Sequence, residues 1–368
     1  MTSNSFTPGA LWPDNNGMHI NAHGGGILFH NGTYYWHGEH KIAGTAGNAA
    51  HVGVHCYSST DLYNWKDDGI ALEVSDDPSS DITAGCTLER PKVIYNRKTG
   101  KFVMWFHLEF KGQGYTTSRA GVAVADEPTG PFTFLRSFRP DAGCWPINAT
   151  AAMKTALQDP AMVAEMHTRR FSGGPDADLP RYPVCARDVA GGQMSRDMTL
   201  FVDDDDKAYH IYASEENSTL HISLLTPDYL ASSGTYMRVF EYRWHEAPAL
   251  CKHQGRYWLI SSGCTGWAPN PARSAVADSI WGPWTELDNP TEGINPRNGL
   301  GPELTFGGQS TFLLPVQGRL DAFIAMFDEW HPDNAIDGRY LWLPVRFEQG
   351  RLRIRWHNEW SLDAFYKP

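Results

Sequence analysis

Five positions along the chain combine residue types and spacing that could support acid–base chemistry. Each stands at the start of an apolar segment that leads into a turn and an aromatic segment: His23, Glu89, Asp197, Glu246 and Gln309. Three carboxyl groups in equivalent positions would repel one another if buried together, which raises the pKa of some of them. Carboxyl groups that face each other across a sugar hydrolyse glycosidic bonds, one as the acid and the other activating water, while a third holds up the acid's pKa.

The elements that must position these residues form a repeat. A motif of apolar run, turn and aromatic run occurs at residues 27–36, 93–105, 200–212, 249–260 and 312–324. Each copy predicts a β-hairpin, because its turn contains Gly, Asn or Asp residues that tolerate positive φ. Hairpins repeated at intervals of many tens of residues favour a propeller. The sequence therefore predicts an all-β fold, a five-bladed β-propeller, whose inner strands carry the five positions around one axis.

A second hairpin follows the first in several repeats, which predicts four strands in each blade. Its copies are Asp126–Phe134 and Asp278–Leu287, each with a Gly-Pro pair before an aromatic strand, and a degenerate copy at Ser58–Trp65. No linker or change of composition divides the chain. We expect one catalytic domain over residues 1–368.

One segment interrupts the repeat, at residues about 138–192. It contains six prolines and predicts a short helix over Thr150–Met166. An insertion of this length is typical of a rim or lid over a pocket. A passive surface loop or an oligomer contact is equally consistent with the sequence. Near the C-terminus, Gly350–Trp356 alternates polar and apolar residues and predicts a strand. We expect that strand to pair near Leu11–Ile20 and so close the ring.

Composition excludes several classes of function. The formal net charge is −11 and the chain has no basic run, so we expect no nucleic-acid partner and no membrane partner. The six cysteines are scattered without a Cys-x-x-Cys pair, which argues against a zinc site; we expect no metal and no organic cofactor. The N-terminus lacks the charged and apolar regions of a signal peptide, which predicts a cytoplasmic protein or a trimmed secreted or periplasmic one.

The chain resembles glycoside hydrolase family 43 in its five-blade plan, in Ser195-Arg-Asp-Met198 and in Glu246-Ala-Pro248. Members of that family are five-bladed propellers that hydrolyse with inversion. The resemblance places the family's acid on Glu246 and its pKa-modulating, orienting carboxylate on Asp197. Some relatives hold a central cation, but the sequence shows no cluster of ligands for one.

One departure narrows the resemblance. The family's base is an Asp in the first blade, where this chain reads Ala22-His23-Gly24. The exo-β-1,3-galactanase branch shares this loss and is similar in Asn21–Gly26, Trp36–Lys41, Glu89–Lys92 and Gly308–Thr311. Its members place a Gln, in an imidic-acid role, where the base would be. The resemblance thus implies Gln309 as the catalytic substitute with Glu89 close to it; Glu89 as the base itself, or as a ligand of a sugar hydroxyl, stays open.

The same branch implies that Glu39 binds sugar hydroxyls. From their residue types, we also expect Trp267 to stack on the sugar ring and His23 to be a ligand of a hydroxyl rather than a base. The remaining candidates are Glu216, Thr265 and Arg339.

The expected function is therefore that of an inverting exo-glycosidase. It would release terminal galactose from β-1,3-galactan or arabinogalactan side chains. An α-L-arabinofuranosidase or β-xylosidase on the same scaffold is the alternative within this class. A catalytically dead sugar-binding propeller is the alternative outside it, because the first-blade Asp is missing.

Overall fold

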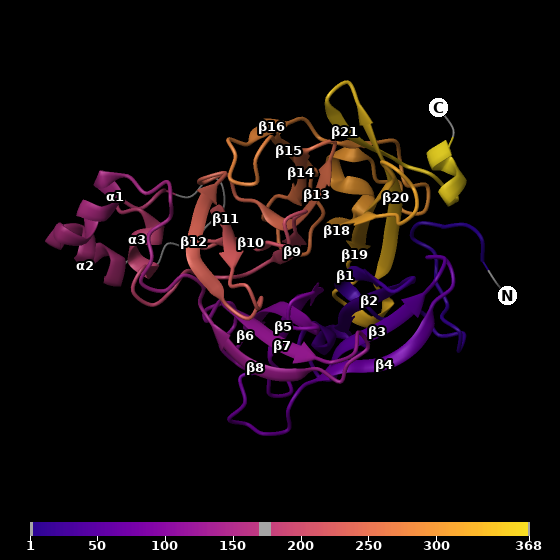
Figure 1. Ribbon diagram of the computed structural model, residues 1–368, viewed down its shortest axis with the longest axis horizontal. Helices are drawn as coiled ribbons and strands as arrows, with labels where there is room; N and C mark the ends of the chain where they lie inside the picture. The colour runs from indigo at the N-terminus through magenta and orange to yellow at the C-terminus, as the bar shows by residue number, and fades with distance from the viewer. Residues whose placement is uncertain (1–2, 169–177, 367–368) are drawn as a thin grey trace.

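Five β-sheets surround one axis in the computed structural model, which describes residues 3–168 and 178–366 (Figure 1). Each sheet is one blade, so the predicted five-bladed β-propeller is confirmed. The strands, blade by blade, are β1 (His23–His30), β2 (Thr33–His40), β3 (Gly53–Ser59) and β4 (Lys66–Glu73); β5 (Thr87–Asn96), β6 (Lys101–Glu109), β7 (Arg119–Ala125) and β8 (Thr133–Phe138); β9 (Met198–Val202), β10 (Ala208–Ser214), β11 (Thr219–Leu225) and β12 (Ser232–Val239); β13 (Glu246–His253), β14 (Arg256–Ser262), β15 (Arg273–Ala277) and β16 (Thr285–Leu287); β18 (Gln309–Pro315), β19 (Phe323–Glu329), β20 (Arg339–Glu348), β21 (Arg351–Arg355) and β17 (Thr291–Glu292).

The innermost strand of each blade is the first strand of its repeated hairpin. These inner strands contact one another in a closed ring, in the order β1, β5, β9, β13, β18 and back to β1. Successive strands within a blade pair antiparallel, except that the short β17 joins β21 in parallel. The five predicted site positions therefore stand at the same end of five neighbouring strands.

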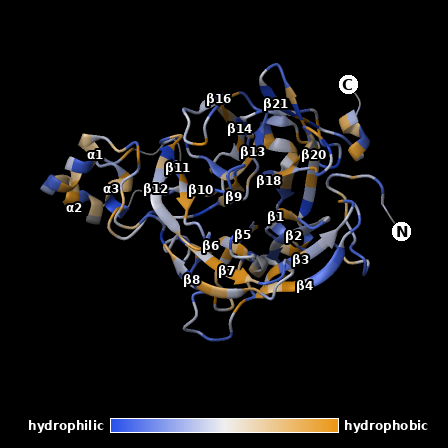
Figure 2. Cartoon of the chain, in the orientation of Figure 1, coloured by the Kyte–Doolittle hydropathy of each residue, from blue (hydrophilic) through white to orange (hydrophobic). Residues whose placement is uncertain are grey.

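Apolar side chains fill the spaces between neighbouring blades. Trp36 of the first blade and Trp342 of the fifth are fully buried, with ring centroids 4.8 Å apart. Trp105 of the second blade packs in one cluster with Leu200 of the third. Figure 2 shows hydrophobic residues along strands of all the blades and hydrophilic residues on many of the connecting loops. These buried tryptophans thus hold neighbouring blades together.

The ring closes differently from the expectation. β21 pairs with β20 and β17 of its own blade, and the predicted pairing near Leu11–Ile20 is wrong. Leu352 and Ile354 explain this, because both are buried in the core of the fifth blade. The two ends of the chain meet instead through Phe6 and Trp360, whose main chains exchange hydrogen bonds of 2.7 and 3.0 Å.

The segment between β8 and β9 contains α1 (Ala151–Thr155), α2 (Pro160–Thr168) and α3 (Val184–Asp188). A helix is present where one is expected, but it is broken between α1 and α2, because Pro160 begins a new helix and Asp159 caps it. Figure 1 places these helices beside the outer strand β12, away from the axis. No helix within the described ranges has the length and apolarity needed to span a bilayer.

Candidate active site

A cavity of about 350 Å³ lies where the N-terminal ends of the inner strands converge. Residues of every blade line it; most of these residues are polar or charged, and two are tryptophans. The residues that line it are Glu39, Glu89, Arg90, His107, Tyr115, Arg196, Asp197, Asn217, Glu246, Gly266, Trp267, Gln309 and Trp330. Four of the five positions singled out in the sequence are therefore brought together; His23 is the exception.

A β-bulge follows the site residue in four of the blades. The register between the inner strand and its partner shifts directly after His23, Glu89 and Glu246, and in the fifth blade it shifts after Ser310, one residue beyond Gln309. In the second blade, for example, Glu89 lies opposite His107. A shift of one residue moves a side chain to the other face of a strand, so each bulge re-aims the residue that precedes it.

Glu246 and Asp197 form a pair of carboxyl groups at the cavity. The Asp197 carboxylate accepts hydrogen bonds from Arg90 Nη2 (3.0 Å) and from the main-chain N–H of Ala247 (3.1 Å). Glu246 Oε1 accepts one from Asn217 Nδ2 at 2.6 Å. Burial, and then the negative charge of Asp197, raise the pKa of Glu246 to about 8. Glu246 therefore keeps its proton at neutral pH and is able to donate it.

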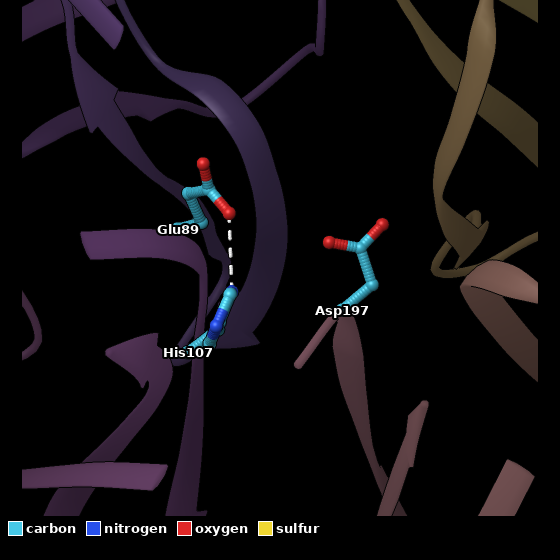
Figure 3. Close-up of side chains that lie close together, drawn as sticks. All are labelled: Glu89, His107 and Asp197. Carbon is cyan, nitrogen blue, oxygen red and sulfur yellow. Dashed lines mark hydrogen bonds and ion pairs between the residues drawn. The ribbon is translucent and has the colours of Figure 1, made fainter. Parts of the chain in front are cut away.

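Glu89 has the opposite electrostatic setting (Figure 3). Its oxygens accept hydrogen bonds from His107 Nδ1 (3.1 Å) and from the Tyr115 hydroxyl (2.7 Å). Burial alone would raise the pKa of Glu89, but the hydrogen bond and charge of His107 outweigh it and hold the pKa at about 2. His107 also bonds Glu109 through Nε2 at 3.0 Å. Although burial opposes its charge, the two carboxylates raise the pKa of His107 to about 9, so Glu89 is ionised beside a cation.

Gln309 is held through both ends of its amide. Its Oε1 accepts hydrogen bonds from Arg90 Nη2 (2.6 Å) and Trp330 Nε1 (2.9 Å), and its Nε2 donates to Ser262 Oγ (2.9 Å). The Arg90 guanidinium also lies over the Trp330 ring, 5.3 Å from its centroid. Both lone pairs of the amide oxygen are thus occupied, while one amide hydrogen remains free for another partner.

Buried charged groups support the cavity wall from behind. Glu39 is 3% exposed and bonds Lys41 Nζ at 2.6 Å and the main-chain N–H of Arg90 at 2.9 Å. Lys92 Nζ donates to the main-chain oxygen of Gly24, whose N–H donates to Asp328. Burial lowers the pKa of Lys92 to about 7 and raises that of Asp328 to about 7. This interlocked set keeps Glu39 and Arg90 in place.

Comparison with known proteins identifies the family. The model of glycosyl hydrolases family 43 matches residues 182–300. A family 43 β-1,3-galactosidase solved with galactodeoxynojirimycin is 50% identical, with a TM-score of 0.88, over 97% of this chain and 100% of the other. The chain belongs to glycosyl hydrolase family 43. No curated protein sequence matches it.

Two other family 43 relatives are exo-β-1,3-galactanases. The enzyme from Phanerochaete chrysosporium, solved with β-1,3-galactotriose, is 31% identical over 98% of this chain and 68% of that one, with a TM-score of 0.75. The enzyme from Clostridium thermocellum is 33% identical over 97% of this chain and 66% of that one, also with a TM-score of 0.75. The resemblance read from the sequence is confirmed, and the chain is a glycoside hydrolase.

The predicted substrate-binding residues of this family 43 chain divide into two groups. Glu39 and Trp267 line the cavity, and Trp267 is 41% exposed at its wall. Four others do not line it within the described residues: His23, Glu216, Thr265 and Arg339.

Each of those four is engaged elsewhere. His23 is fully buried and stacks on Tyr340, so the structure does not support its expected contact with a sugar hydroxyl. Glu216 is buried between two arginines, and Arg339 bonds Asp337 at 2.7 Å. Thr265 is exposed next to the lining residue Gly266, where its hydroxyl donates to Ala268.

One group in the cavity has the composition of a metal site. Single ligand atoms of Glu89, His107 and Asp197 lie within 4.8 Å of one another. Figure 3 shows the three side chains around one space. However, both ring nitrogens of His107 are already hydrogen-bonded to carboxylates, and Asp197 is paired with Arg90. The arrangement is therefore better explained as a network of paired charges than as a metal centre.

Sequence reasoning missed several lining residues. His107, Tyr115 and Trp330 carry no motif, and Arg90 and Asn217 lie in the matching segments Glu89–Lys92 and Ser214–Leu220 without having been predicted as site residues. His107 could have been found by pairing the strands of the repeated hairpin, but only with the bulge placed correctly. Tyr115 and Asn217 come from turns between outer strands, whose path the sequence pattern does not predict.

Proposed function

We propose that this chain is an inverting exo-β-1,3-galactosidase that releases terminal galactose from β-1,3-galactan or arabinogalactan side chains. As a member of its family it acts on an oligosaccharide or polysaccharide. The observation that carries the proposal is the pairing, in one cavity, of Glu246, whose pKa is about 8, with the ionised Glu89. Its similarity to a β-1,3-galactosidase and to an exo-β-1,3-galactanase supports galactose as the sugar. A cavity of about 350 Å³ suits one chain end rather than a long polymer segment.

In this proposal Glu246 is the general acid. It gives its proton to the glycosidic oxygen as the bond to the leaving sugar breaks. The neighbouring Asp197 adds to the effect of burial and keeps the pKa of Glu246 high, because ionising Glu246 would place two negative charges together. Arg90 and the N–H of Ala247 hold the Asp197 carboxylate in position.

Glu89 and Gln309 position and deprotonate the attacking water. The Gln309 oxygen already accepts two hydrogen bonds, so it is not free to accept one from water; the free amide hydrogen can donate to the water instead. Glu89 then takes the proton. A weakly basic carboxylate suffices, because water that bonds to an oxocarbenium-like carbon is itself strongly acidic. An imidic-acid form of Gln309 carries a proton on its oxygen and would require Arg90 or Trp330 to turn away.

Glu39 and Trp267 are the proposed binding residues. Glu39, held by Lys41 and by the main chain of Arg90, presents its carboxylate to sugar hydroxyls. Trp267 is partly exposed at the cavity wall, 5.7 Å from the Trp330 ring, and offers an apolar face to a pyranose.

A substrate panel tests the sugar and the stereochemistry. The chain should release galactose from β-1,3-galactobiose, and proton NMR should detect the α-anomer first. Nitrophenyl α-L-arabinofuranoside and β-xyloside should be poor substrates. Faster release of arabinose or xylose would favour the alternative within the class. Binding without turnover would favour a dead sugar-binding propeller, and β-galactose as the first product would contradict inversion.

The variant Glu246→Gln tests the acid. It should lower kcat/KM on β-1,3-galactobiose by about 10²–10⁴-fold, the range of general acid catalysis. Nitrophenyl β-galactoside should lose much less, because its leaving group needs no proton. Equal losses on the two substrates would remove Glu246 from this role.

A further inference from the structure

The turn between β10 and β11 has an unusual backbone. Glu215, Glu216 and Asn217 are three consecutive non-glycine residues with positive φ, of 52°, 59° and 68°. Each such residue costs about 1–3 kcal/mol and persists when its surroundings hold it in place. Non-glycine residues with positive φ are uncommon, so three in succession beside a cavity require an explanation.

Glu215 anchors the turn from one side. Its side chain is fully buried and accepts hydrogen bonds from His221 Nε2 at 2.9 Å and Arg238 Nε at 2.5 Å. Burial alone would raise the pKa of Glu215, but His221 and Arg238 hold it at about 2. A buried carboxylate paired in this way is strongly fixed in position, because moving it would leave charges unpaired.

Glu216 anchors the turn from the other side. Its two oxygens accept hydrogen bonds from Arg196 Nη2 (3.0 Å) and Arg187 Nη1 (3.1 Å). Arg196 precedes Asp197 in the chain and lines the cavity, while Arg187 belongs to α3 of the segment between β8 and β9. That segment is therefore connected to the active site through Glu216, although its helices lie beside β12.

Asn217 is the residue that the two anchors present to the cavity. Its Nδ2 donates to Glu246 Oε1 at 2.6 Å, and Cys264 Sγ lies 3.8 Å from its main-chain oxygen. In a protonated carboxyl group, the oxygen that accepts a hydrogen bond is the carbonyl oxygen. A fixed amide N–H at Oε1 therefore leaves Oε2 to carry the proton.

We propose that the turn Glu215–Ser218 positions Asn217 so that the proton of Glu246 is confined to Oε2, the oxygen that donates to the leaving group. Asn217 is thus a positioning residue for acid catalysis. This inference rests on the proposed function, since it presupposes that Glu246 is the acid. The segment between β8 and β9 contributes to the same task through Arg187.

The variant Asn217→Asp tests the proposal with almost no change of shape. It replaces the N–H donor with a carboxylate oxygen, which when ionised can only accept, so a hydrogen bond between the two groups draws the proton of Glu246 to Oε1. We expect kcat/KM on β-1,3-galactobiose to fall at least thirtyfold and kcat/KM on nitrophenyl β-galactoside to fall less than threefold. The melting temperature should stay within a few degrees of the parent, which excludes a general loss of structure.

The outcomes are distinguishable from failure of the proposed function. Glu246→Gln is measured in parallel: if it shows the difference between substrates and Asn217→Asp does not, the positioning proposal is overturned and the acid assignment stands. Full activity of Asn217→Asp would mean that the Asn217 oxygen accepts the proton of Glu246. Equal losses on both substrates would assign Asn217 to sugar binding instead and would also overturn the proposal.

A second pair of variants tests the connection to α3. Arg187→Met removes one of the two arginines that hold Glu216, and it should lower kcat/KM on β-1,3-galactobiose more than on nitrophenyl β-galactoside, by about three- to tenfold. Lys154→Met is the matched control, because Lys154 is exposed on α1 of the same segment. It should leave both values unchanged. If the two variants are equally active, the segment between β8 and β9 does not contribute to the position of Asn217.

Discussion

At the scale of single residues, environment divides the chemistry between two carboxyl groups. Burial and the charge of Asp197 together raise the pKa of Glu246 to about 8, whereas His107 outweighs burial at Glu89 and holds its pKa at about 2. Their amino-acid type is the same, and the sign of the neighbouring charge decides which one gives a proton and which one takes it.

The first prediction concerns pH. Because Glu246 must be protonated to act, kcat/KM should be high below its pKa and fall as the pH rises through about 8. In Asp197→Asn the charge that raises this pKa is gone, so the basic limb should move to lower pH. Asp205→Asn, at an exposed acid, is the control and should not move it. An unchanged limb in Asp197→Asn would contradict the pairing.

The second prediction concerns Glu89, the group that takes the proton of the attacking water. Glu89→Ala removes the group that takes the proton and should lower turnover of nitrophenyl β-galactoside by about 10²-fold or more. Sodium azide should partly restore turnover and yield α-galactosyl azide, because a small anion attacks without a base. If azide has no effect, Glu89 acts by binding or by holding Tyr115 and His107 rather than as the base.

At the scale of elements, the bulges near the start of the inner strands aim the site residues. In the first blade this bulge contains Gly24, with φ of +59°. A Cβ on Gly24 would lie 2.2 Å from Glu39 Oε1. Only glycine fits at this position, for two reasons: the backbone has a positive φ, and the Glu39 carboxylate approaches too closely for a Cβ.

The third prediction uses this position. Gly24→Ala should displace Glu39 and lower kcat/KM on β-1,3-galactobiose by about tenfold or more, and it should destabilise the fold by about 1–3 kcal/mol. Gly32→Ala is the matched control in the same blade: its φ is +82°, but no atom lies within 4 Å of an added Cβ. It should cost stability without a loss of kcat/KM. Equal kinetic losses would mean that backbone strain alone explains the effect.

At the scale of the whole molecule, the site depends on a closed ring. Phe6 and Trp360 join the two ends of the chain, with ring centroids 4.5 Å apart. Trp360 also donates its Nε1–H to the main-chain oxygen of Trp342 at 2.8 Å. Because catalytic residues come from different blades, any opening of the ring would separate them.

The fourth prediction tests this closure. Trp360→Ala should lower the free energy of unfolding by about 3–5 kcal/mol, as expected for removal of a buried tryptophan, and galactosidase activity should be lost at a lower temperature than in the parent. Urea unfolding followed by tryptophan fluorescence measures the first effect. Leu320→Ala, at a residue that is 93% exposed, should change stability by less than about 0.5 kcal/mol. A similar small change for Trp360→Ala would show that the ring closes without it.

The sequence alone determined the number of blades, the inner strands and the four residues Glu89, Asp197, Glu246 and Gln309, because hairpin repeats and strand starts are local patterns. The tertiary structure decided what local patterns do not encode. His23 starts an inner strand like Glu89 and Glu246 but is buried against Tyr340 instead of lining the cavity. Residues far apart in the chain, such as Arg90 and Gln309 or Asn217 and Glu246, met only when the ring closed. Their charges then set the pKa values, because these depend on neighbours in space rather than in sequence.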